Sequence, residues 1–220
     1  SSGDTMLIMA FRQAMQTECN RRDELLQLFS RTMQEVCEGQ QYDVNFETRD
    51  DVGVDEYLEM IRLKTSVLLG CAVRIGAMLA GAPAEDVESL YRFGEAMGLA
   101  FQLQDDYLDV YGDSAVFGKE IGGDIMCNKK TYMLINALAE AEGDDKVELQ
   151  RWIDTVDADR KEKVAAVTAI YDKLGIDRMA KAKMEEYYKV ALAALDEVNV
   201  TEERKQPLRE YAAKMMKRNK

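Results

Sequence analysis

The sequence predicts an all-α protein. Apolar residues recur at spacings of three and four over almost the whole chain, whereas the alternating β-branched runs that indicate strands are scarce. Only two prolines, Pro83 and Pro207, interrupt the 220 residues, and no Gly/Ser-rich or charged linker divides them. We therefore expect a single helical domain over residues 1–220, a length that one domain commonly reaches.

The apolar spacing predicts helices at residues 4–20, 22–48, 54–81, 84–112, 128–142, 145–156, 158–174, 176–198 and 206–219. Asp4 is placed to cap the first helix, and Gly81-Ala82-Pro83 closes the third because a residue before proline avoids helical geometry. The long stretch without this periodicity covers residues 112–126 and contains four glycines, and long loops in compact domains are often functional. Pro207 suits the first turn of the last helix, where its missing N–H leaves no bond unmade.

The composition excludes several classes of function. The net charge of −12, from 29 basic and 41 acidic residues, argues against sequence-independent nucleic-acid binding, which needs a basic surface. The most apolar stretch, residues 66–84, carries Arg74 near its middle and is expected to be a buried helix and not a membrane span. Histidine is absent, which excludes His-ligated zinc and Ser-His or Cys-His nucleophiles.

We expect the sulfur-containing residues to pack in the apolar core. The four cysteines are widely spaced and lie inside helical patterns, which favours reduced, packed thiols and a cytoplasmic protein. We expect the thirteen methionines to fill the core, with these examples along the chain: Met6, Met9, Met15, Met78 and Met97.

An aspartate cluster carries the clearest chemical signal. On the helix expected at residues 84–112, Asp105, Asp106 and Asp109 project from one side, and the residues around them are apolar or aromatic. An acidic surface face would explain the aspartates alone, but carboxylates in an apolar bundle need a cation. Oxygen ligands without histidine indicate a hard ion such as Mg²⁺, which usually bridges to substrate phosphates. The lysines that follow, Lys119, Lys129 and Lys130, supply the charge that a diphosphate needs.

These motifs resemble those of a known family. The pattern F-Q-x-Q-D-D-x-x-D at residues 101–109, followed by G-K-x-x-G-G-D at 118–124 and N-K-K-T at 128–131, is similar to the second aspartate-rich region of trans-polyprenyl diphosphate synthases of the farnesyl and geranylgeranyl type. Residues 39–43 resemble the family's G-Q-x-x-D element, and Lys64-Thr65 resembles its K-T pair. The resemblance covers nearly the whole chain.

The resemblance implies both a fold and a reaction. The fold is a helical bundle around a central cavity, with aspartate motifs on facing helices near its mouth. The reaction is the Mg²⁺-dependent condensation of isopentenyl diphosphate with an allylic diphosphate, such as dimethylallyl, geranyl or farnesyl diphosphate, through a carbocation. Family members are expected to be homodimers.

The resemblance also implies a role for each matching residue. Asp105 would bind Mg²⁺, with Asp106 and Asp109 in support. Three lysines would share the diphosphate charge and stabilise its departure: Lys64, Lys119 and Lys129. Thr65 and Gln102 would position the allylic substrate. Asp43 would orient metal-bound waters, and Asp124 would brace Lys129 or a metal-bound water.

The chain departs from the family pattern at its beginning. The family's first aspartate-rich motif, the arginine pair after it and the N-terminal basic residues that bind isopentenyl diphosphate lie upstream of the position matching Gly3-Asp4. We therefore expect the chain to match the C-terminal two-thirds of the family, without the first helices, and to be inactive alone. Neither the length of the product nor the preferred allylic substrate is indicated.

Two other functions stay open. A class I terpene cyclase shares the bundle but carries N-x-x-x-S/T-x-x-x-E, and the fourth residue after Asn128 is Tyr132, which does not fit that pattern. A non-catalytic helical partner subunit would keep the fold and lose the chemistry, and the joint presence of the aspartates and lysines counts against it.

Overall fold

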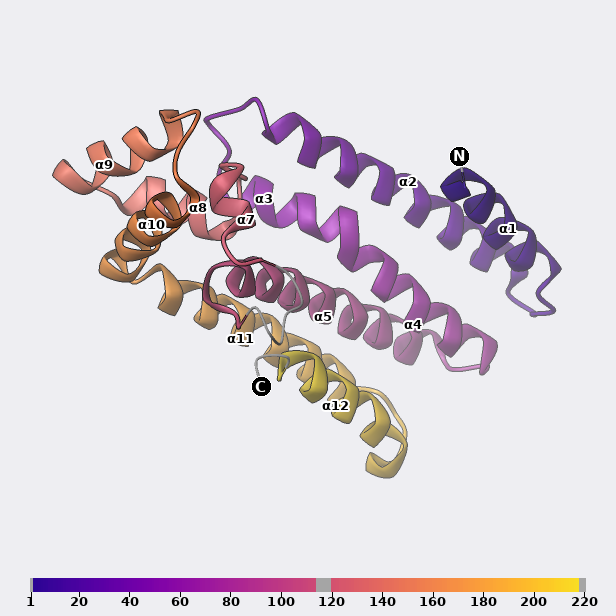
Figure 1. Ribbon diagram of the computed structural model, residues 1–220. Coiled ribbons are helices and arrows are strands. Elements are labelled where there is room, and N and C mark those ends of the chain that lie inside the picture. Colours follow the sequence, from indigo (N-terminus) through magenta and orange to yellow (C-terminus); the bar gives the residue numbers. More distant parts are fainter. Residues whose placement is uncertain (1, 114–119, 218–220) are drawn as a thin grey trace.

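The all-α prediction is confirmed. A computed structural model describes residues 2–113 and 120–217, and these residues form helices joined by turns, with no strand among them (Figure 1). The helices are α1 (Ser2–Gln16), α2 (Arg22–Phe46), α3 (Val54–Ile61), the π-helical turn η1 (Arg62–Ser66), α4 (Val67–Leu79), α5 (Ala84–Tyr111), α7 (Gly123–Met126), α8 (Tyr132–Glu140), α9 (Gly143–Asp154), α10 (Arg160–Leu174), α11 (Ile176–Asp196) and α12 (Glu202–Met216).

The long helix α5 forms the centre of the bundle. It packs most extensively against α11 on one side and against α4 on the other, while α2 lies along η1 and α4 (Figure 1). The apolar side chains of the second half of α5, such as Leu103 and Leu108, join a core with α8, α9, α10 and α11. Those of its first half, such as Phe93 and Met97, pack against α11 and α12. The short helices α7 and α8 therefore gather at the end of α5 that carries the aspartates.

The helix predicted at residues 54–81 contains an irregular turn. It runs from α3 through η1 into α4, and its five-residue π-helical turn holds Lys64 and Thr65. Such turns occur often at functional sites. The predicted end is confirmed, because Gly81 has φ +72° and the N–H groups of Gly81 and Ala82 bond to the carbonyls of Met78 and Ala77.

Three predicted helix starts are wrong. The first helix begins at Ser2, so Asp4 lies in its first turn and not at its cap. The helix predicted from residue 128 begins at Tyr132, because Asn128 has φ +49° and the Thr131 hydroxyl caps the helix by accepting from Leu134 N–H. The last helix begins at Glu202, so Pro207 lies inside it.

The prediction that the methionines and cysteines pack in the core is only partly right. Met78 and Met97 are buried, but Met6, Met9 and Met15 are exposed on α1, which buries none of its residues. All four cysteines are free thiols; Cys71 is buried, whereas Cys37 and Cys127 are exposed. As expected for residues 66–84, none of the helices within the described ranges has both the length and the apolar character needed to cross a membrane.

A glycine brings α2 onto the π-helical turn. A Cβ atom built on Gly39 would lie 2.3 Å from the backbone nitrogen of Lys64, much closer than any real contact. Because the obstacle is backbone, a side-chain movement cannot relieve it. Gly39 therefore sets the distance between α2 and the turn that carries Lys64 of the K-T pair.

We expect Gly39→Ala to lower the free energy of unfolding by about 1–3 kcal/mol, as overpacked substitutions do. Gly76→Ala is the matched control, because a Cβ on that helical glycine meets nothing within 4 Å and should stabilise the protein by about 0.5–1 kcal/mol. Urea unfolding followed by circular dichroism measures both. Two stabilising substitutions would show that α2 does not approach η1 closely.

Candidate functional site

One wall of the candidate site comes from α2 and η1. Asp43 lies one turn after Gly39 on α2, and its Oδ2 is 2.6 Å from Nζ of Lys64. Both side chains are partly buried. The G-Q-x-x-D element thus has a physical basis, since its glycine admits the π-helical turn and its aspartate pairs with the lysine of that turn.

A second contact joins η1 to the central helix. The Thr65 hydroxyl donates to Oε1 of Gln102 over 3.1 Å, at the place where Gly98 of α5 packs against Ser66. A Cβ on Gly98 would lie 2.6 Å from the Cα of Ser66, so only glycine permits this approach. The two residues predicted to position the allylic substrate therefore lie together.

Asp106 faces the interior of the bundle. Its side chain is 3% exposed, and its Oδ2 accepts hydrogen bonds from the Tyr57 hydroxyl of α3 and, over 3.2 Å, from the backbone N–H of Tyr132 at the start of α8. Burial raises the pKa of Asp106 to about 7, although the bond from Tyr57 acts to lower it. Asp106 thus joins three helices.

The other two aspartates of the cluster lie differently. Asp109 binds α7, because its Oδ2 accepts from Asp124 N–H over 2.9 Å and its carbonyl accepts from Gly122 N–H over 2.6 Å. Asp105 is partly exposed on the same helix. The three carboxylates therefore do not converge, and the described residues contain no group of three or more His, Cys, Asp or Glu side chains arranged around one metal ion.

The segment between α7 and α8 places Lys129 beside Asp124. Lys129 Nζ lies 3.6 Å from Asp124 Oδ1. Burial lowers the pKa of Lys129, but the carboxylates of Asp124, Asp106 and Asp43 outweigh burial, so that this pKa is raised and the ammonium stays protonated. Lys119, also implicated by the motif, lies outside the described residues.

Asp43, Asp124 and Lys129 border a cleft of about 640 Å³. It is lined by Asp43, Phe46, Glu47, Gly123, Asp124, Cys127, Asn128, Lys129 and Lys130. Asp43 connects the two lysine sites, because it pairs with Lys64 and its charge also acts on Lys129. Asp105 does not line this cleft.

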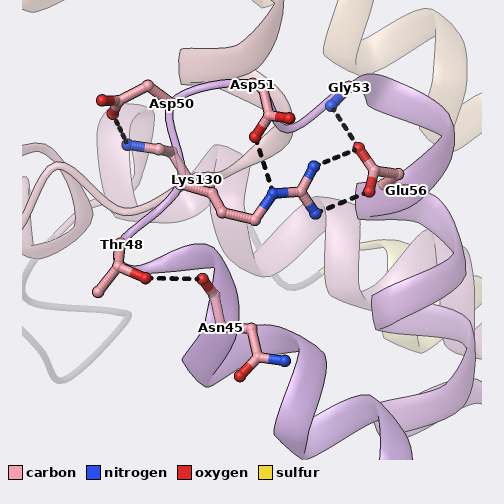
Figure 2. A network of polar contacts seen from close by, with 8 residues as sticks. Asn45, Thr48, Asp50, Asp51, Gly53, Glu56 and Lys130 are labelled. Carbon is pink, nitrogen blue, oxygen red and sulfur yellow. Dashed lines mark hydrogen bonds and ion pairs between the residues drawn. The ribbon is translucent and has the colours of Figure 1, made fainter.

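The loop between α2 and α3 contacts Lys130, one of the residues that line the cleft. Figure 2 shows Lys130 reaching Asp50 of this loop, with Nζ 3.4 Å from Oδ1. Arg49 donates to Asp51 and, through two nitrogens, to Glu56, whose Oε2 also accepts from Gly53 N–H. The network orders the residues that follow Phe46 and Glu47 of the cleft.

Several residues that shape the site had no role predicted from the sequence. Tyr57, Asn128 and Lys163 make buried or partly buried polar contacts around the aspartates and lysines. Only Asn128 gave a signal, because asparagine is among the few residues that tolerate positive φ. Tyr57 and Lys163 had none, since their partners are distant in the sequence.

Comparison with known proteins decides the family. The model of the polyprenyl synthetase family matches residues 1–172, which is more than half of the chain. The chain belongs to the polyprenyl synthetase family. The resemblance of its motifs to polyprenyl diphosphate synthases is therefore confirmed.

The relatives of this polyprenyl synthetase chain are longer proteins. It is 33% identical over 214 residues to a short chain isoprenyl diphosphate synthase of Methanothermobacter thermautotrophicus, covering 97% of this chain and 62% of that protein. A solved geranylgeranyl pyrophosphate synthase is similar with a TM-score of 0.91 and 43% identity, over 99% of this chain and 68% of the other. A geranylgeranyl pyrophosphate synthase of Corynebacterium glutamicum, solved in complex with isoprenyl diphosphate and magnesium, is 26% identical with a TM-score of 0.88, over 98% of this chain and 62% of the other.

Proposed function

We propose that this chain forms the diphosphate-binding part of a Mg²⁺-dependent prenyltransferase that condenses isopentenyl diphosphate with an allylic diphosphate. The supporting observation is the pair of lysines at the aspartate end of α5. Lys64 and Lys129 each lie beside a carboxylate, and Asp43 acts on both. The family's names for its members and the bound isoprenyl diphosphate of the Corynebacterium relative favour the same substrate class.

The donor set suits a magnesium ion shared with the substrate. Magnesium usually takes one or two protein carboxylates together with waters and substrate phosphates, and does not need a cage made by the protein alone. Asp105 is the ligand we propose, because it begins the D-D-x-x-D motif and is partly exposed, whereas Asp106 is turned into the core. When bound, the ion would neutralise negative charge on the leaving diphosphate.

The chain's own residues would act by electrostatics and orientation. Lys64 and Lys129 exchange their carboxylate partners for diphosphate oxygens and stabilise the negative charge that develops as the allylic bond breaks. Thr65 and Gln102 hold the substrate beside this charge, while Asp43 and Asp124 keep the lysines oriented before the substrate arrives. This reaction needs no histidine. From the family alone we infer a cytoplasmic homodimer.

Lys129→Met should reduce the affinity for inorganic diphosphate in the presence of Mg²⁺ by about 10- to 100-fold, the equivalent of one charge-assisted hydrogen bond. Isothermal titration calorimetry of this chain gives the dissociation constants. Lys146→Met is the matched control, because that lysine is exposed on α9 away from the cleft. An equal loss of affinity in both variants would indicate a general charge effect. If the chain were a non-catalytic subunit, the parent itself should bind no diphosphate.

A further inference from the structure

A buried lysine contacts the loop that carries Lys129. Lys163 of α10 is 2% exposed, and its Nζ donates to Oδ1 of Asn128 over 2.7 Å. No carboxylate in the described part of the chain lies within ion-pair distance of this ammonium. Burial lowers the pKa of Lys163, which means that burying its charged form costs free energy in the folded protein.

The other end of the Asn128 amide is also held. Its Nδ2 donates to the carbonyl of Ile153 on α9 over 2.9 Å. The nitrogen and the oxygen of the amide are therefore hydrogen-bonded to α9 and α10, respectively. Within the described ranges, Asn128 is the only non-glycine residue with positive φ, at +49°. The left-handed conformation is unfavourable for most residues with a side chain, and asparagine is among the few that tolerate it.

The turn at Asn128 determines where Lys129 lies. Directly after it, the N–H of Lys129 donates to the Asp124 carbonyl over 3.0 Å, and the Lys129 carbonyl accepts from Thr131 N–H over 2.8 Å. This backbone arrangement brings the Lys129 ammonium beside Asp124 in the cleft. A residue that fixes Asn128 therefore also fixes Lys129.

We propose that Lys163 is a positioning residue, which holds Lys129 in the cleft through its hydrogen bond to the side-chain amide of Asn128. A charge-assisted hydrogen bond is roughly twice as strong as a neutral one, which gives a reason for a lysine at this buried position. Lys163 is not among the residues that line the large cleft. The part of the proposal that concerns diphosphate rests on the function proposed above.

Hydrogen exchange of the backbone amides tests the positioning directly and needs no ligand. Lys163→Met keeps most of the side-chain volume and removes the donor, so the amides of Lys129 and Thr131 should exchange about 10- to 100-fold faster. Lys205→Met is the matched control, because Lys205 is also buried and its Nζ donates to the carbonyl of Asp196, in another part of the bundle. Unchanged exchange at Lys129 and Thr131 in Lys163→Met, or an equal change in Lys205→Met, would overturn the proposal.

A double-mutant cycle tests the link to the anion. Lys163→Met should weaken binding of inorganic diphosphate with Mg²⁺ by about tenfold in the parent chain but not in a Lys129→Met background, because the effect passes through Lys129. Additive losses would contradict this link. If the parent binds no diphosphate, the proposed function is wrong, while the exchange rates still decide the positioning role.

Asn128→Ala keeps the proposal testable if Lys163→Met does not fold. It removes the acceptor of the same bond, and also the bond to Ile153 and the residue type that tolerates positive φ, so exchange at Lys129 should accelerate by at least a similar factor. Lys163→Arg, which keeps a charged donor, should stay closer to the parent than Lys163→Met. Exchange at Lys129 that is unaffected by Asn128→Ala would show that the amide does not hold the turn.

Discussion

Replacing Asp106 with alanine should lower the free energy of unfolding by about 2–4 kcal/mol, because two buried donors lose their acceptor. These donors are the Tyr57 hydroxyl and the Tyr132 N–H, so α3, α5 and α8 would be separated at one point. Asp106→Asn is the matched control, since its amide oxygen can accept both bonds and its volume is almost the same. Urea unfolding at neutral pH compares the two variants. Equal stability of the alanine and asparagine variants would show that this contact does not hold the helices together.

The raised pKa of Asp106 also predicts that the stability of the protein depends on pH. The pKa of Asp106 is raised to about 7 in the folded protein, whereas an unfolded aspartate titrates near 3.9. The folded state therefore binds the proton more tightly, and this group's contribution to stability is complete below about pH 4 and is lost as the pH rises to about 7. Relative to Asp106→Asn, the parent should lose at most about 1.4 kcal/mol per pH unit in this interval. A constant difference between the two proteins from pH 4 to 7 would contradict the raised pKa.

Much of the fold could be predicted from apolar spacing alone. The spacing gives α2, α5, α10 and α11 within a few residues, because long amphipathic helices repeat their pattern over many turns. It could not reveal η1, since one extra residue in a single turn hardly changes the pattern of apolar positions. The start of α8 has a local signal in the sequence, a threonine directly before an apolar run. That the chain forms one domain stays a prediction.

The candidate site was predictable as far as its motifs are local. Lys64, Thr65, Gln102 and Asp43 were named from short patterns, and the fold brings them together in two contacts. Helical spacing suggested that Asp105, Asp106 and Asp109 act together, but it cannot reveal that Asp106 has a partner 49 residues away. For the same reason short patterns cannot indicate the contact of Lys163 with Asn128, which depends on the packing of α10 against the α7–α8 segment.

The second large effect is expected at Asp105. Asp105→Asn removes ligand charge without removing volume. It should reduce the Mg²⁺-dependent affinity for an allylic diphosphate by at least about 10- to 100-fold, because the loss of a residue that only supports a metal ligand already weakens metal binding by that factor. Circular dichroism and the melting temperature should stay almost unchanged. Asp157→Asn serves as the matched control, because it removes the same charge from an exposed loop.

One titration decides whether this end of α5 binds a diphosphate through magnesium and lysine. Geranyl diphosphate is titrated calorimetrically into the parent chain and into Asp105→Asn, with Mg²⁺ and with EDTA. We expect binding by the parent that weakens strongly in EDTA, and weak binding by Asp105→Asn under both conditions. Equal affinities with Mg²⁺ and with EDTA would show that magnesium does not hold the diphosphate, and equal affinities of the parent and Asp105→Asn with Mg²⁺ would show that Asp105 is not its ligand.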